Sequence, residues 1–171
     1  MTERSRARRA RSTGRAAIAA LGALLLVAGC GGSGSPLPAE EAVAHYEDVS
    51  TDLLGALDAV RPLTWEHRAQ EILEPGAEDC RYQAGIWEAD AALYPEPGQG
   101  MDWEPWRTAV DPVLEEHGFE ALGREQSSGG EYWLESQGPH GARIVLESRG
   151  SLRITDVRVD AEPCEDAALG L

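Results

Sequence analysis

The sequence predicts an α+β fold, a two-layer domain in which two helices cover one face of an antiparallel sheet of about five or six strands. Two segments, 39–60 and one starting near Asp102, repeat apolar residues at helical spacing. The last third of the chain instead alternates apolar and polar residues between glycine-containing turns. Alternating strands have one covered face and one solvated face, so the helices are expected on a single side of the sheet.

The first helix is predicted over residues 39–60. Glu40 and Glu41 lie in its first turn, where negative charge is favourable to the helix dipole, and Pro62 ends it. The apolar residues that define its buried stripe are Ala42, Val43, Tyr46, Val49, Leu53, Leu54, Leu57 and Val60.

Two strands are expected next, over 65–73 and 81–89, with a turn at 74–79 between them. Tyr82, Ala84 and Ile86 alternate with polar residues and glycine in the second strand. The Pro- and Gly-rich segment 95–100 is predicted to be a loop.

Asp102 is predicted to be the N-cap of the second helix, and Gly118 to follow its C-terminus. Pro112 removes a backbone donor inside this helix, so a kink or a break is expected there. The apolar stripe of the helix is Trp103, Trp106, Val110, Val113 and Leu114.

Four further strands are predicted, at 119–126, 131–137, 142–148 and 152–161. The alternation changes phase between Ile154 and Val157, which predicts a bulge near Thr155 and Asp156. The domain is expected to span 39–165, with a frayed tail over 166–171.

Residues 1–29 have the pattern of a lipoprotein signal peptide. Residues 1–15 carry six arginines and one acid, and 16–28 are all apolar or glycine. This run is shorter than the ~20 residues that a transmembrane helix needs. Val27-Ala28-Gly29-Cys30 resembles a bacterial lipobox, which implies lipidation of Cys30, a flexible tether over 30–38, and a membrane-anchored protein on the extracytoplasmic side. The alternative is an ordinary secreted protein in which Cys30 happens to lie at the cleavage site.

Without residues 1–29 the chain has nine arginines against 29 acids, a formal charge of −20. Such a charge repels nucleic acid, which is therefore not expected as a partner, and it favours a monomer. A solvated acidic surface and weak binding of divalent cations are the two interpretations of the acids. The chain has no Lys and no Asn, a bias typical of GC-rich genomes, and with the lipobox it indicates an actinobacterium.

The two remaining cysteines, Cys80 and Cys164, are predicted to form a disulfide in an oxidising compartment. The bridge would close a segment of 84 residues and contribute about 4–5 kcal/mol in the chain-entropy model.

No catalytic or cofactor-binding motif is present, so neither a catalytic residue nor a cofactor is predicted. No metal site is predicted either, because the four histidines have no ligand-like spacing. They are His45, His67, His117 and His140. Paired acids are frequent, but sequence spacing does not show whether two of them face each other across a glycosidase cleft.

Five tryptophans, at positions 65, 87, 103, 106 and 133, lie in the predicted domain. They are either core residues or part of an aromatic groove for a glycan, peptide or lipid. The candidate groove residues are Trp103, Trp106 and Trp133, with Trp103 expected to be exposed at the start of the second helix.

The lipobox, the Glu40-Glu41-Ala42 helix start, Cys80, Gly118-Phe119 and Cys164 together resemble the small LppA-like lipoproteins of actinobacteria. That group has no established activity, so the resemblance implies no catalytic residues. The sequence predicts a non-enzymatic envelope lipoprotein that binds or scaffolds an envelope protein, glycan or lipid. The alternatives are a hydrolase acting on the cell wall and an inhibitor or immunity-type lipoprotein.

Overall fold

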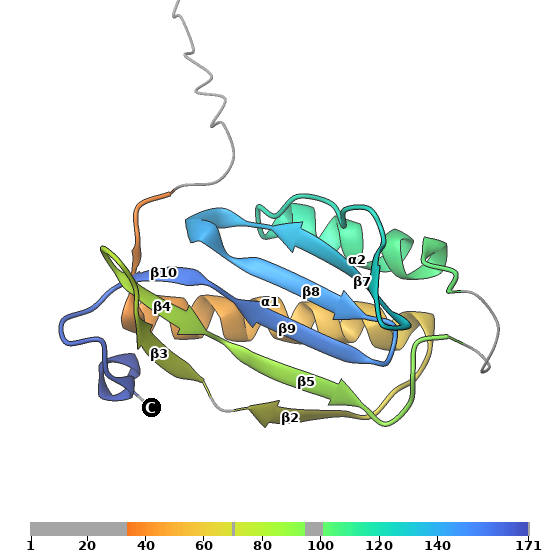
Figure 1. Cartoon of the computed structure of the whole chain (residues 1–171), viewed down its shortest axis with the longest axis horizontal. Coiled ribbons are helices and arrows are strands. Elements are labelled where there is room, and N and C mark those ends of the chain that lie inside the picture. Colours follow the sequence, from red (N-terminus) through yellow and green to blue (C-terminus); the bar gives the residue numbers. More distant parts are fainter. Residues whose placement is uncertain (1–33, 70, 95–100, 171) are drawn as a thin grey trace, which may run out of the picture.

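The computed structural model describes residues 34–69, 71–94 and 101–170. The predicted signal peptide, Cys30 and the predicted loop at 95–100 lie outside the described residues. The described chain forms two α-helices on one side of β-sheet structure (Figure 1). This arrangement confirms the predicted α+β fold class.

The strands form two sheets that are antiparallel except for one parallel pair, β1 with β10. The larger sheet contains, in spatial order, β2 (Trp65–Ala69), β5 (Gly85–Ala89), β9 (Ser151–Thr155), β8 (Arg143–Glu147), β7 (Glu131–Gln137) and β6 (Gln126–Ser128). The smaller sheet contains β1 (Leu37–Pro38), β10 (Val157–Asp160), β4 (Cys80–Gln83) and β3 (Ile72–Pro75).

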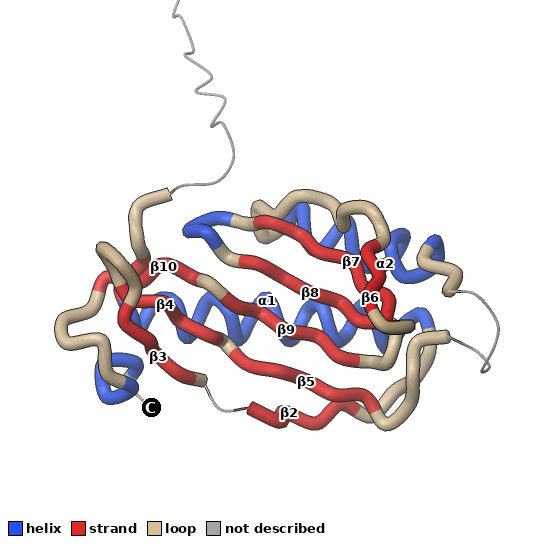
Figure 2. The backbone as a smooth tube through the Cα atoms, viewed as in Figure 1, coloured by secondary structure: helices blue, strands red, loops and turns tan. Residues whose placement is uncertain are grey.

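Two segments of the chain pass from one sheet to the other at a single-residue break. Ala84 separates β4 from β5, and Asp156 separates β9 from β10 (Figure 2). The backbone leaves the extended conformation there, with φ 136° at Gly85 and φ 64° at Asp156. The two breaks lie side by side, because the Ala84 amide donates to the Ile154 carbonyl over 3.0 Å.

The observed ends of the strands correct three predictions. The predicted strand 81–89 is two strands in different sheets, and so is the predicted strand 65–73, which forms β2 and β3. The predicted bulge near Asp156 is the point at which one strand ends and the next begins. At Gly85 and Asp156 the backbone geometry, rather than the side-chain pattern, decides where the strand stops.

Helix α1 (Ala39–Val60) has the predicted bounds, and its stripe is fully buried at Tyr46, Val49, Leu53 and Leu57. It lies behind the middle of the sheet, and α2 (Glu104–Glu116) lies behind β7 and β8 (Figure 1). Neither helix lies behind the edge strand β2, so part of that face of the sheet is left uncovered by helix.

Helix α2 continues through Pro112, so the predicted break is absent. The side chain of Asp102 accepts a hydrogen bond from the Glu104 amide (3.1 Å), although the N-cap residue itself is Trp103. Gly118 adopts φ 77° directly after the helix, as its predicted place at the C-terminus requires. This turn lets the Phe119 amide donate to the Leu114 carbonyl (2.8 Å).

The predicted strand 119–126 is wrong for most of its length, because only β6 (Gln126–Ser128) is a strand there. Phe119 and Leu122 are buried in the core. The Leu122 amide donates to the Asp111 carboxylate (2.9 Å), and the Arg107 guanidinium donates to carbonyls of the same segment. Residues 119–125 are thus held to α2 in place of a full strand ladder.

The disulfide between Cys80 and Cys164 is present, with 5.6 Å between the Cα atoms. It attaches β4 to the segment after β10. The tail that was expected to fray instead forms a short 3-10 helix, η2 (Asp166–Leu169), because Leu169 is buried and the Asp166 carboxylate accepts a hydrogen bond from the Leu73 amide (2.8 Å). The ordered domain also begins before residue 39, since Leu37–Pro38 forms β1.

Candidate functional site

Two of the three predicted groove tryptophans are core residues. Trp103 is 7% exposed and Trp106 is 4% exposed, which corrects the expectation that Trp103 lies at the surface. The Trp103 indole N–H donates to the Glu125 carboxylate (2.6 Å), so the segment before β6 covers the ring. Trp133 is half-buried, and its indole donates to Glu135 (2.8 Å). The predicted groove of Trp103, Trp106 and Trp133 therefore retains only Trp133 at a surface.

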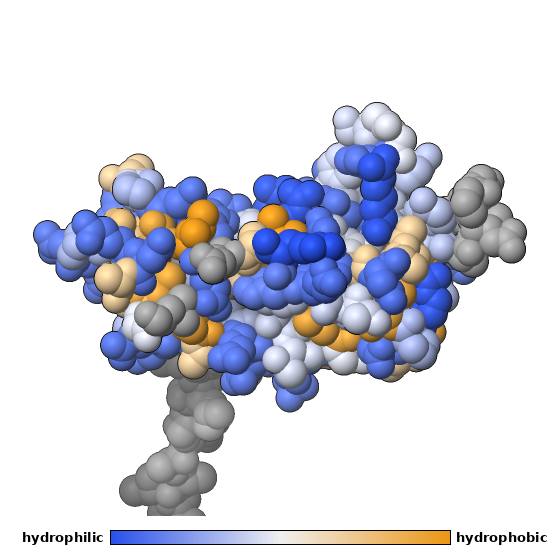
Figure 3. Space-filling model, turned by 90° about the horizontal axis from the view of Figure 1, so that it is seen from below, coloured by the Kyte–Doolittle hydropathy of each residue, from blue (hydrophilic) through white to orange (hydrophobic). Residues whose placement is uncertain are grey.

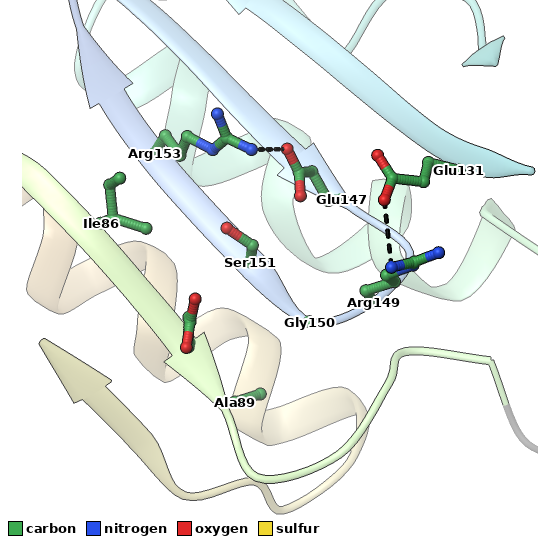
Figure 4. Close-up of a pocket in the computed structure, with 9 residues that line it drawn as sticks. Ile86, Ala89, Glu131, Glu147, Arg149, Gly150, Ser151 and Arg153 are labelled. Carbon is green, nitrogen blue, oxygen red and sulfur yellow. Dashed lines mark hydrogen bonds and ion pairs between the residues drawn. The ribbon is translucent and has the colours of Figure 1, made fainter. Parts of the chain in front are cut away.

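One hollow lies on the face of the six-stranded sheet that the helices leave open. We call it the open-face hollow; its volume is about 460 Å³. Its charged lining residues are Glu88, Glu131, Glu147, Arg149 and Arg153, from β5, β7, β8, β9 and the β8–β9 turn (Figure 4).

Every carboxylate in the open-face hollow has a guanidinium partner. Arg153 pairs with Glu147, and Arg149 pairs with Glu131 over 3.1 Å (Figure 4). Glu88 pairs with Arg68 of the neighbouring strand, also over 3.1 Å. The hollow is therefore charged, but its charges already neutralise one another.

The same pairing continues along the open face beside the hollow. Burial alone would raise the pKa of Glu135, but hydrogen bonds from Trp133 and Arg143, together with the Arg143 charge, lower it overall. A carboxylate held in this way contributes to the stability of the sheet and has little free capacity for a ligand.

The second hollow is a groove of about 330 Å³ on the helix side of the sheet, between α1 and the strands β2 and β5. We call it the α1 groove. Seen from the β2–β3 edge, the molecular surface shows apolar residues interspersed among hydrophilic ones (Figure 3). The lining residues are Val43, Tyr46, Glu47, Ser50, Thr51 and Leu54 of α1, together with His67, Glu71, Ala84 and Trp87.

Two aromatic rings stack along the sheet side of the α1 groove. His67 and Trp87 are cross-strand partners, and their rings are nearly parallel with centroids 4.8 Å apart. Gly85 makes room for this stack, because a Cβ at that position would lie 2.2 Å from the His67 Nε2 atom. Gly85 also has φ 136°, a conformation that L-residues with a side chain rarely adopt.

Two carboxylates, Glu47 and Glu71, line the α1 groove, and one of them contacts a buried hydroxyl group. The Tyr82 hydroxyl donates to the Glu71 carboxylate (3.3 Å). Burial raises the pKa of Tyr82, and the negative charges of Glu71 and Glu47 raise it further. Among the described residues, neither Glu47 nor Glu71 forms an ion pair with an arginine or a histidine. Unlike the open-face hollow, the α1 groove has negative charge that is not compensated.

Three histidines that are far apart in the sequence come together near the start of the ordered chain. His45 and His117 have ring centroids 5.9 Å apart. Burial lowers the pKa of His45, and the charges of His117 and His140 lower it further. His117 contacts Asp52 at 2.9 Å. Within the described parts of the chain, no three His, Cys, Asp or Glu residues are placed to hold a metal ion.

Comparisons with known proteins assign no family to the chain. No protein-family model matches it, and no curated protein matches it significantly. Among solved structures it is similar to the crystal structure of the "putative lipoprotein LppA from Mycobacterium tuberculosis", with 14% identity, 82% of this chain and 83% of that chain covered, and a TM-score of 0.48. In the described chain, no helix has the length and apolar content needed to cross a membrane.

Proposed function

We propose that this protein is a lipoprotein, anchored to the extracytoplasmic face of the cell membrane through Cys30, whose domain binds another envelope component without catalysing a reaction. The observation that carries the anchor is the sequence itself: a basic segment, a short apolar run, and Val27-Ala28-Gly29-Cys30. More than one acyl chain gives stable attachment, which a diacylglyceryl group on this thiol would supply.

The geometry of the ordered chain is compatible with such an anchor. Four residue steps separate Cys30 from Gly34, and at ~3.5 Å per residue they span at most about 14 Å. The Gly34 carbonyl accepts a hydrogen bond from Arg158 (3.4 Å), and the Ser35 carbonyl accepts one from His140 Nδ1 (2.7 Å). A lipid on Cys30 would therefore hold this end of the domain near the membrane surface.

The anchor is tested by Cys30→Ala. The protein should leave the membrane fraction, and it should no longer incorporate a labelled fatty acid. Cys80→Ser is the matched control, because it also removes a cysteine but should leave the protein in the membrane. Retention of the Cys30→Ala variant in the membrane fraction would contradict lipid anchoring at this residue.

The binding role is supported by the α1 groove. Its volume of about 330 Å³ falls at the lower end of the range of small-molecule sites, which is roughly 300–1,000 Å³. It combines apolar, aromatic and polar side chains, as ligand sites do. Crosslinking in intact membranes should capture a reproducible partner or ligand with the unmodified protein and much less of it with Trp87→Ala. Failure to capture anything would count against the binding role.

A cell-wall hydrolase is the second candidate, because Glu47 and Glu71 line the same groove and glycosidases use paired carboxylates. Glu71 accepts a hydrogen bond from the Tyr82 hydroxyl, which positions its carboxylate as the candidate base or nucleophile. If the protein is a hydrolase, it should release soluble fragments from purified cell wall, and Glu71→Gln should abolish the release. No release by the unmodified protein would exclude this candidate.

A further inference from the structure

We propose that the α1 groove selects ligands that carry a primary amine in its cationic form, with the ammonium group held by Glu47 and Glu71 and the attached stem or ring lying against Trp87. This inference rests on the proposed binding function and specifies the chemical class of the ligand.

The first observation that supports an amine ligand is the negative charge of the groove. The described chain forms eight ion pairs, none of which involves Glu47 or Glu71. Helix α1, which forms one wall, contains no basic residue apart from His45. Its six acids are Glu40, Glu41, Glu47, Asp48, Asp52 and Asp58. Nearby negative charge raises the local concentration of cations and disfavours anions.

The position of the two carboxylates is the second step. Both carboxylates line the groove, and Glu71 is positioned by a hydrogen bond from the Tyr82 hydroxyl. A carboxylate can accept several hydrogen bonds, so Glu71 retains acceptor capacity beyond its bond with Tyr82. Ser50, which is 5% exposed, donates its hydroxyl proton to the Glu47 carbonyl (2.9 Å) and keeps its oxygen lone pairs as acceptors. An ammonium group has three donors, and Glu47, Glu71 and Ser50 all contribute acceptor oxygens to the lining of the groove.

The aromatic wall is the third step. A cation near the face of a tryptophan ring is stabilised by the ring quadrupole, and the stabilisation is greater where water is excluded. Trp87 is half-buried and lines the groove, so its ring is within reach of a ligand. Val43 and Leu54 add apolar surface on the helix side. The lining thus suits an amine on a compact apolar stem or a sugar ring.

The size of the groove is the fourth step. A space of about 330 Å³ accommodates a single amino sugar or a short diamine. A long polymer would lie mostly outside the groove and would insert one amine-bearing unit. Selection by charge would then act on that unit.

The test compares two sugars that differ in charge at one position. The full-length protein, extracted from membranes in non-ionic detergent, is titrated with glucosamine and with neutral N-acetylglucosamine by isothermal calorimetry, at a pH at which the glucosamine amine is protonated. Glucosamine should bind at least about tenfold more tightly, and added salt should weaken its binding. Equal binding of the two sugars, a preference for N-acetylglucosamine, or no binding of either would overturn the proposal.

Variants locate the site and separate this proposal from the binding function. Glu47→Gln and Glu71→Gln should each weaken glucosamine binding by about tenfold, whereas Glu131→Gln, in the open-face hollow, should leave it unchanged. Circular dichroism checks that each variant is folded. If glucosamine binding fails while the membrane crosslinking still captures a Trp87-dependent partner, the amine selectivity is wrong and the binding function stands. Loss of both would contradict both proposals.

Discussion

The open-face hollow and the α1 groove lie on opposite faces of the same six-stranded sheet, and both contain glutamates, yet they differ in how those glutamates are neutralised. In the open-face hollow, Glu88, Glu131 and Glu147 each pair with an arginine. In the α1 groove, Glu47 and Glu71 have no such partner among the described residues. In the larger hollow the charges are therefore paired within the protein, whereas the proposed binding groove is the smaller one with unpaired carboxylates.

The difference follows from where the arginines lie. Of the nine arginines beyond residue 30, six lie in strands or in the β8–β9 turn: Arg68, Arg81, Arg143, Arg149, Arg153 and Arg158. Outward-facing strand positions bring opposite charges on neighbouring strands within reach of each other. Helix α1 contains six acids and no arginine, so it offers its groove no equivalent pairing.

The largest expected effect is on the stability of the whole domain. Cys80→Ser removes the disulfide with Cys164, which should lower the free energy of unfolding by about 4 kcal/mol, because the unfolded chain is no longer constrained. Urea unfolding measures the change, and Cys164 should become reactive to thiol reagents. Reactive thiols at both positions in the unmodified protein would show that no bridge forms.

The next largest loss of stability should come from a substitution beside the α1 groove. Gly85→Ala places a methyl group against the His67 imidazole in a backbone conformation with φ 136°. We expect a loss of about 3 kcal/mol in stability, from strain and overpacking together. Glucosamine binding should fall as well, because the His67–Trp87 stack must move.

Gly55→Ala is the matched control for this variant. Gly55 lies within α1, and no atom approaches the position of its added Cβ within 4 Å. Alanine should therefore stabilise the helix by about 0.5–1 kcal/mol. A Gly85→Ala protein as stable as Gly55→Ala would show that the close approach of His67 does not constrain the strand.

Titratable groups on the two faces of the sheet should also change the stability at opposite ends of the pH range. The pKa of Tyr82 is raised from 10.0 in the folded state, so above pH 10 the unfolded chain loses this proton first. Stability should then fall with rising pH by up to about 1.4 kcal/mol per pH unit per tyrosine. Tyr46, which is also buried with a raised pKa, should add to this loss. Tyr82→Phe should make the alkaline decrease less steep in a series of unfolding measurements.

On the open face, stability should instead fall as the pH decreases. The pKa of Glu135 is lowered from 4.5 in the folded state, so its stabilising contribution is present above pH 4.5 and is lost as pH falls through the folded value. Glu135→Gln should reduce the loss of stability in acid and leave the alkaline decrease unchanged. An alkaline decrease that changes equally in both variants would contradict this separation of the faces.

The smallest effect on stability should come from removing an arginine that pairs with a glutamate of the open-face hollow. Arg153→Gln removes the partner of Glu147, in a pair whose side chains are 42% and 23% exposed, so the loss of stability should be below about 1 kcal/mol. The more informative measurement is ligand binding by the double variant Arg153→Gln/Arg149→Gln. Its open-face hollow should gain a weak second site for glucosamine. Calorimetry that still fits one site would show that free carboxylates alone do not attract the amine.

The sequence was sufficient where local pattern and packing agree. The three- and four-residue spacing from Ala42 to Val60 predicted α1 with the observed bounds, and β7 also has its predicted bounds. The disulfide pairing followed from the two cysteines left after Cys30. These features depend on neighbouring residues or on a count of thiols, and both can be obtained from the sequence.

The break at Ala84 could not be predicted from alternation. Tyr82 and Ala84 are buried, and the pattern suggested that Ile86 continues their face. In the structure the backbone at Gly85 changes the phase, so Trp87, paired with buried Leu152, faces α1 instead. The glycine within an apparent strand was the one local sign of such an irregularity.

The α1 groove was missed for a related reason. Glu47 lies in α1 and Glu71 between β2 and β3, and only the packing of α1 against the sheet brings them into one groove. The sequence instead favoured Trp103 as a groove residue, because the start of a helix is commonly exposed. It could not show that Glu125 would cover that ring.

The most direct test of the difference between the hollows is to locate a bound amine. Backbone amide shifts are mapped by NMR while 1,5-diaminopentane is added to the detergent-solubilised protein. We expect perturbations centred on Tyr82, Trp87 and Ser50 in the α1 groove, with Glu147 and Ser151 of the open-face hollow unaffected. Perturbations centred on the open-face hollow, or none at all, would contradict the conclusion that uncompensated charge marks the binding site.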